Sequence, residues 1–231
     1  MGTRGADPLA AGVQQTVPLA LRAGMSRCRS PAGKRSYLVS FPPEERSGIT
    51  SVGPMDYTDL PFTDAPQGSE GEVLLFALER VHRQFGWKTG GLTAEQLCRT
   101  HPPSSMTLAG LIKHLAFVED GWTAKALGRP IGPPWDMRDW VGNDGWGWES
   151  AVTDEPEDLY NLWYGTVARS HAAWSQMIID GGLDAEPPQE GGYIVNRRRL
   201  LVDLLEENLL HTGHASLLRE AIDGLRGNDP W

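Results

Sequence analysis

Residues 200–225 read LLVDLLEENLLHTGHASLLREAIDGL and contain the pattern on which the fold depends. Successive residues of an α-helix turn by about 100°, so residues spaced by three and four positions share one face. One such face combines apolar with ionisable residues, and its members are Leu200, Leu204, Glu207, His211, His214 and Leu218. The spacing predicts a long helix whose buried face holds a carboxylate and two imidazoles.

The ionisable residues on this face need partners, because burying an unpaired charge costs several kcal/mol. Glu207 and His211 stand four positions apart, a separation from which two side chains of one helix can bind a single divalent ion. The same spacing suits a polar core network in which Glu207 hydrogen-bonds to His211 or to a neighbouring helix. The pattern alone leaves both interpretations open.

The same periodicity predicts four amphipathic helices, at about residues 69–89, 107–127, 156–177 and 197–223. Ser69 and Glu72 form a capping box at the start of the first helix, and Gly224 ends the last one. No strand pattern is evident, and the segments after the second and third helices are long enough for crossover connections. The sequence therefore predicts an all-α four-helix bundle with long connecting loops.

The N-terminal part of the chain differs in composition from the rest. Residues 1–65 are rich in Gly, Pro, Ser and Arg without an apolar period, so we expect a disordered extension there and the bundle at residues 66–231. We expect translation to begin at Met55. The apolar runs are shorter than the roughly 18 residues that cross a bilayer, and Cys28 and Cys98 form no paired motif. A cytoplasmic protein with no membrane partner is expected.

The charge distribution argues against nucleic acid as a partner. The formal charge is −9, and because residues 1–43 hold six basic residues and one acidic residue, residues 44–231 carry −14. Nucleic-acid binders neutralise phosphates with a basic face. The basic cluster at residues 197–199 begins the last helix, where we expect it to be solvated or paired with neighbouring acids.

Residues 129–152 combine many prolines and glycines with four tryptophans, which predicts a long connection without regular structure. Either its indoles cover the bundle, or it forms a lid over a ligand pocket. For the second case, Trp135, Trp140 and Trp146 are the candidates for contact with a substrate.

A metal site inside a bundle draws its ligands from facing helices, and the second helix offers His114. This histidine lies at the edge of the apolar face, with Gly110 and Gly121 on the same side. The two glycines are expected to leave space beside the imidazole. Together with Glu207 and His211, His114 favours a site with three ligands.

The segments LIKHLAFVE (residues 111–119) and ENLLHTGH (residues 207–214) together resemble the DinB-like family of metal-binding four-helix bundles. The resemblance covers about residues 69–226, and the chain is similar to an actinobacterial branch of unknown function that includes the mini-circle proteins of streptomycetes. The family binds a divalent metal through a histidine of the second helix and a His or Glu followed four residues later by His. The resemblance thus implies His114, Glu207 and His211 as ligands of zinc or nickel.

The resemblance also implies a reaction. Several DinB-like proteins are thiol S-transferases or thiol-dependent isomerases, and a glutamate at the first position of the pair is the pattern of the mycothiol-dependent maleylpyruvate isomerases. Two histidines and one glutamate leave a coordination position open, as catalytic sites do. The expected partners are therefore a small-molecule thiol, mycothiol first, and an electrophile.

Two questions stay open at this point. The chain is either such a metal-dependent enzyme or a non-catalytic DinB-like protein that binds a metal or a small molecule. A homodimer is compatible with either function. His214, three residues beyond His211, is a candidate fourth ligand, hydrogen-bond partner or catalytic acid or base, with simple packing as the alternative.

Overall fold

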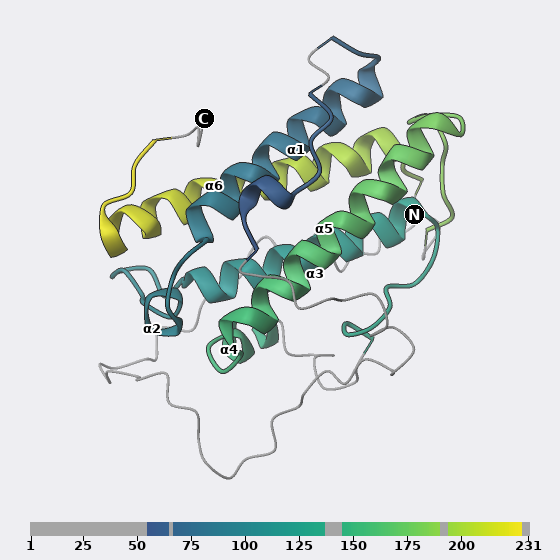
Figure 1. Ribbon diagram of the computed structural model, residues 1–231. Helices are drawn as coiled ribbons and strands as arrows, with labels where there is room; N and C mark the ends of the chain where they lie inside the picture. Colours follow the sequence, from purple (N-terminus) through teal and green to yellow (C-terminus); the bar gives the residue numbers. More distant parts are fainter. Residues whose placement is uncertain (1–54, 65–66, 137–144, 190–193, 228–231) are drawn as a thin grey trace.

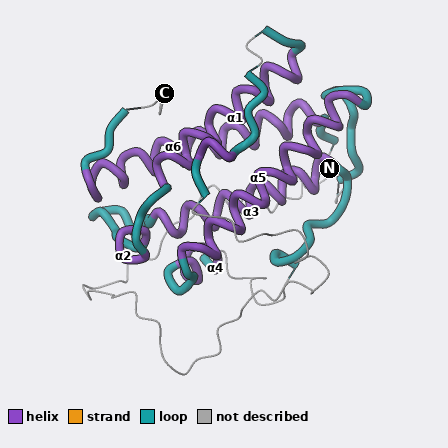
Figure 2. Tube along the Cα trace, viewed as in Figure 1, coloured by secondary structure: helices purple, strands orange, loops and turns teal. Residues whose placement is uncertain are grey.

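A computed structural model of the chain describes residues 55–64, 67–136, 145–189 and 194–227. All regular structure in these residues is helical (Figure 1, Figure 2). The four long helices are α1 (Glu70–Thr89), α3 (Leu108–Ala126), α5 (Pro156–Ile179) and α6 (Arg197–Asp223). The short ones are α2 (Ala94–Leu97), α4 (Trp146–Ala151) and a 3-10 turn at Tyr57–Asp59. The predicted all-α four-helix bundle is confirmed.

The long helices begin and end where local capping chemistry predicts. The backbone amide of Ser69 donates to the Glu72 carboxylate over 2.7 Å, which completes the capping box of α1. The Thr107 hydroxyl accepts the Gly110 amide at the start of α3, and the Asn196 side chain caps α6. Gly224 ends α6 in a left-handed conformation with φ 84°.

The helices run in two parallel pairs. At one end of the bundle Arg198 of α6 pairs with Glu70 of α1, so the first turns of these helices lie together. Arg219, near the end of α6, donates to the carbonyls of Lys88 and Gly90 at the end of α1. Helices α3 and α5 run together in the opposite direction (Figure 1). The end of α3 and the start of α5 therefore lie at opposite ends of the bundle, which requires a crossover connection between them.

Helix α3 packs against both α5 and α6, while α1 packs against α6 and α5. The core between them is filled by large apolar side chains that are almost fully buried, among them Phe85, Leu111, Leu115, Trp163, Trp174 and Leu204. Each such side chain contributes roughly 1.5–3 kcal/mol through burial. This packing holds α3 and α6 side by side, which matters for the site because each carries part of it.

The bundle begins earlier than the sequence suggested. Leu60 is 3% exposed within the core, and Arg83 donates to its carbonyl oxygen. The Glu79 carboxylate accepts both the amide and the hydroxyl of Thr63. The predicted boundary at residue 66 is therefore too late, because this segment docks through single contacts that leave no periodic pattern. The rest of the predicted extension, residues 1–54, lies outside the described residues.

Two short helices were also not predicted. Helix α4 lies inside residues 129–152, which were expected to lack regular structure, and α2 is a single turn closed by a Thr93 and Gln96 capping box. Both are too short to show a helical period, and α4 packs on α3. The basic residues 197–199 are paired as expected: Arg198 binds Glu70 and Asp184. Among the described helices, none has the length and apolarity needed to span a membrane.

Candidate metal centre

The structure brings His114, Glu207 and His211 together. His114 extends from the second turn of α3, and the other two lie one turn apart on α6. The Glu207 Oε2 atom is 3.6 Å from His114 Nε2 and 3.4 Å from His211 Nε2. One possible ligand atom from each residue lies within 4.8 Å of the others. The spacing on α6 thus places two donors opposite the single donor of α3.

These distances fit a bound ion better than a hydrogen-bonded network. Donor atoms about 2.1 Å from a tetrahedral zinc ion lie about 3.4 Å from each other, whereas a hydrogen bond joins atoms about 2.9 Å apart. The Nε2 atom of His114 is buried and has no hydrogen-bond partner in the described residues. Such an orphaned nitrogen is costly unless another group binds it. The donor set therefore fits a divalent metal.

The electrostatics of the cluster keep its carboxylate ionised. The imidazoles of His114 and His211 lower the pKa of Glu207 to about 2, against the opposing effect of burial. Its side chain is 20% exposed, so the site stays open to solvent on one side. An ionised glutamate is the form that binds a divalent cation.

His214 lies behind His211. The two Nδ1 atoms are 3.3 Å apart, so a hydrogen bond joins the two rings. Burial, and in smaller part His211, lower the pKa of His214, which favours its neutral, accepting form. If His211 donates through Nδ1, its Nε2 lone pair points toward Glu207 and is free for a metal. His214 lies outside the group of three and contacts it through His211.

Trp148 is the site residue that the sequence analysis missed. Its indole stacks on the His114 imidazole with ring centroids 5.1 Å apart and an interplanar angle of 22°. Gly110 makes this possible, because a Cβ atom there would lie 2.4 Å from Trp148 Cε3. The expected space beside His114 is thus filled by an indole at Gly110, while Gly121 faces Ile131. The sequence signal for this contact was Gly110, which lies one helical turn before His114 and leaves room for a large side chain.

The model of the family described as mycothiol S-transferase matches residues 73–224, which include every residue of the cluster. The chain belongs to the mycothiol S-transferase family. This family lies within the DinB-like superfamily, so the resemblance stated from the sequence is confirmed. A search among curated proteins found no match to the chain.

Two of the candidate tryptophans of this mycothiol S-transferase family member, Trp135 and Trp146, pack on α3. Trp135 is 2% exposed, and its indole N–H donates to Asp120. Trp146 meets Trp135 edge to face and lies under the Lys113 ammonium at 4.6 Å. Both indoles pack on the flank of α3, which agrees with the first alternative for residues 129–152, in which the indoles cover the bundle. Trp140 lies outside the described residues, so contact of these three with a substrate stays a prediction.

A second histidine and carboxylate cluster lies in the bundle core. His82 Nε2 is 2.6 Å from Glu119 Oε1, and the Asn208 amide donates to the same oxygen over 2.9 Å. His171 likewise pairs with the buried Glu79. His82 is 2% exposed, so its pair with Glu119 belongs to the core of the bundle.

Proposed function

We propose that the chain is a divalent-metal-dependent mycothiol S-transferase, with His114, Glu207 and His211 as ligands of zinc or nickel. The observation that carries the proposal is the buried Nε2 atom of His114, which has no hydrogen-bond partner in the described residues and lies 3.6 Å from Glu207 Oε2. The same Glu207 oxygen is 3.4 Å from His211 Nε2. Family membership supports the thiol, and the donor set supports the metal.

Each of these residues has a defined task. A divalent ion held here would lower the pKa of a thiol that it binds, which supplies a thiolate at neutral pH. The Glu207 carboxylate and the neutral imidazoles provide the donors. When His211 donates its Nδ1 hydrogen to His214, the ring is held in the form that exposes Nε2. His214 is thus a positioning residue rather than a fourth ligand.

Trp148 limits access to the site. Its indole covers one face of His114, and the ring centroid is 6.2 Å from that of His211. An electrophile must then approach past this indole, which offers a flat apolar surface for an uncharged group. A low-molecular-weight thiol requires a reducing compartment, so the proposal includes a cytoplasmic location.

The proposal is tested by transfer of mycothiol to monobromobimane, in which the thiol sulfur displaces bromide and releases a proton. The zinc-loaded wild type should accelerate the reaction well above its uncatalysed rate, and His211→Ala should reduce it to background. His101→Ala, which removes an exposed loop histidine, is the matched control and should retain full activity.

Two results would contradict the proposal. A zinc-loaded wild type that gives only the uncatalysed rate with several unrelated electrophiles is not a transferase of this kind. Saturable binding of mycothiol without turnover would instead support a non-catalytic binding protein.

A further inference from the structure

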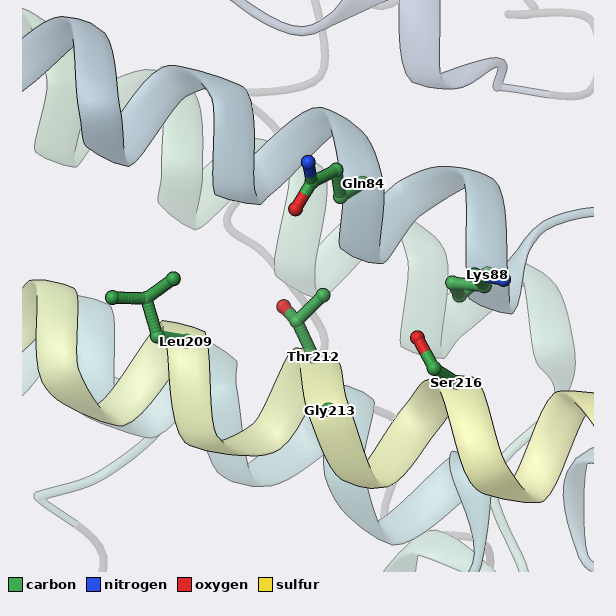
Figure 3. Close-up of a pocket in the computed structure, with 6 residues that line it drawn as sticks. All are labelled: Gln84, Lys88, Leu209, Thr212, Gly213 and Ser216. Atoms are coloured by element: carbon green, nitrogen blue, oxygen red, sulfur yellow. The ribbon is translucent and has the colours of Figure 1, made fainter. Parts of the chain in front are cut away.

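A groove of about 150 Å³ lies between α1 and α6, next to the proposed metal centre but on another face of α6 (Figure 3). Its lining residues are Gln84 and Lys88 from α1 and Leu209, Thr212, Gly213 and Ser216 from α6. Thr212 directly follows His211 in the sequence, yet it faces α1, whereas His211 contacts His114 of α3. The groove is therefore distinct from the ligand cluster.

Lys88 is 2% exposed, and Glu220 and Asp223 act on its ammonium from beyond ion-pair distance. Lysine is almost never buried to this extent without a partner. The neighbouring cations are paired, Arg219 with Asp223 and Arg226 with Glu220, but no carboxylate of the described residues forms an ion pair with Lys88. Its ammonium lies over the Trp87 ring at 4.4 Å. Burial and the charge of Arg219 lower the pKa of Lys88.

Thr212 has an unused hydrogen-bonding group at the same place. Its side chain is 8% exposed, and its Oγ1 atom is buried without a partner in the described residues. Leaving a buried hydroxyl unsatisfied costs about 1–3 kcal/mol. Figure 3 shows the Thr212 and Ser216 side chains pointing from α6 toward α1. Two hydroxyl-bearing side chains and Lys88 thus line the same groove.

Gly213 keeps the groove open. A glycine in a helix interior costs about 1 kcal/mol relative to alanine. At Gly213 no steric reason requires it, because a Cβ atom would meet nothing within 4 Å. The helix therefore carries an unfavourable residue at a position that lines the groove.

We propose that this groove binds a small monocarboxylate through the Lys88 ammonium and the hydroxyls of Thr212 and Ser216. The single positive charge of the Lys88 ammonium matches one negative charge, which is that of a monocarboxylate. The volume corresponds to roughly five water molecules, which suits a carboxylate of a few non-hydrogen atoms. The site requires neither the metal nor mycothiol.

Titration of the full chain with acetate, followed by amide chemical shifts in NMR spectra, tests this site. Acetate should produce saturable shifts at α1 and α6 in the millimolar range, and acetamide, which has the same shape without the charge, should not. Lys88→Met should weaken acetate binding by more than about tenfold. Lys125→Met is the matched control, because Lys125 also lies over an indole, at 4.6 Å from the Trp122 ring. It should bind acetate as the wild type does.

Gly213→Leu tests the groove without removing a structural contact. Its side chain extends from a position with free space, so the variant should fold and melt at the same or a higher temperature while acetate binding is lost. Its metal content should be unchanged, which separates this site from the proposed metal centre. Unsaturable shifts, equal binding of acetamide, or a Gly213→Leu variant that still binds acetate would overturn the proposal.

Discussion

The bundle contains two clusters of histidine and glutamate that differ in geometry. In the core cluster, His82 and Glu119 approach to 2.6 Å, and both are almost fully buried. In the ligand cluster, Glu207 lies 3.4 Å and 3.6 Å from the two histidine nitrogens, and its side chain is 20% exposed. Helix α3 contributes to both clusters, five residues apart, through His114 and Glu119.

The difference shows that residue type alone does not distinguish a structural network from a ligand site. A hydrogen bond of 2.6 Å leaves no room for an ion between the two atoms that it joins. Donors about 3.4 Å apart with an orphaned nitrogen are arranged for a group that lies among them. The core cluster should therefore affect folding, and the ligand cluster should affect metal binding.

Removing the core carboxylate should produce the largest loss of stability. Glu119→Ala leaves the His82 imidazole and the Asn208 amide without their shared acceptor, so we expect a loss of roughly 3–5 kcal/mol in the free energy of unfolding. Urea unfolding of the metal-free protein measures it. Glu119→Gln, which keeps an acceptor oxygen, should lose less, and a loss below about 1 kcal/mol in Glu119→Ala would contradict the assignment.

The ligand cluster should make the metal-free protein sensitive to acid. The pKa of Glu207 falls from 4.5 to about 2 on folding, so its contribution is complete above pH 4.5 and is lost as the pH falls toward 2. This difference corresponds to roughly 3 kcal/mol. Urea unfolding between pH 6 and pH 3 should show a steeper decline for the wild type than for Glu207→Gln. Identical slopes would exclude an ionised Glu207 held by the two histidines.

The packing of Trp148 on Gly110 should be sensitive to one added methyl group. Gly110→Ala places a Cβ atom 2.4 Å from the indole, so we expect a loss of roughly 1–3 kcal/mol and a changed tryptophan emission. Gly121→Ala is the matched control on the same helix, because its Cβ would lie 3.8 Å from Ile131. Equal effects of the two substitutions would show that Gly110 has no special role.

Removing the indole that stacks on His114 should have the smallest effect, and the effect should be on zinc affinity. Trp148→Leu removes the aromatic contact that holds the His114 ring, so zinc affinity should weaken by about threefold to tenfold. Competition with a chromogenic chelator measures the affinity. Trp146→Leu alters the flank of α3 without an observed contact to the ligands, and it should leave the affinity unchanged. A similar loss in both variants would indicate a general packing defect.

Much of the fold follows from local sequence. The capping pairs and apolar periods of the long helices depend on residues within one or two turns, which is why their bounds were predicted closely. The α4 turn and residues 55–64 were missed because tertiary contacts stabilise them, such as the hydrogen bonds between Thr63 and Glu79.

The residues of the candidate site also differ in how far the local sequence reveals them. Glu207 and His211 share a helical face, so their proximity was visible in the sequence, and His114 was found because a bundle site needs a facing donor. Trp148 reaches His114 from a different segment and only through the space at Gly110. The placement of Lys88 and Thr212 on one groove depends on α1 and α6 running in parallel, which no periodicity reveals.

Metal content tests the central claim most directly. Elemental analysis after zinc loading and extensive dialysis should find about one ion per chain in the wild type and in His82→Gln, and almost none in His211→Ala. Circular dichroism should show all three proteins folded. A wild type without bound metal, or a His211→Ala variant that retains its zinc, would contradict the assignment of His114, Glu207 and His211 as the metal centre.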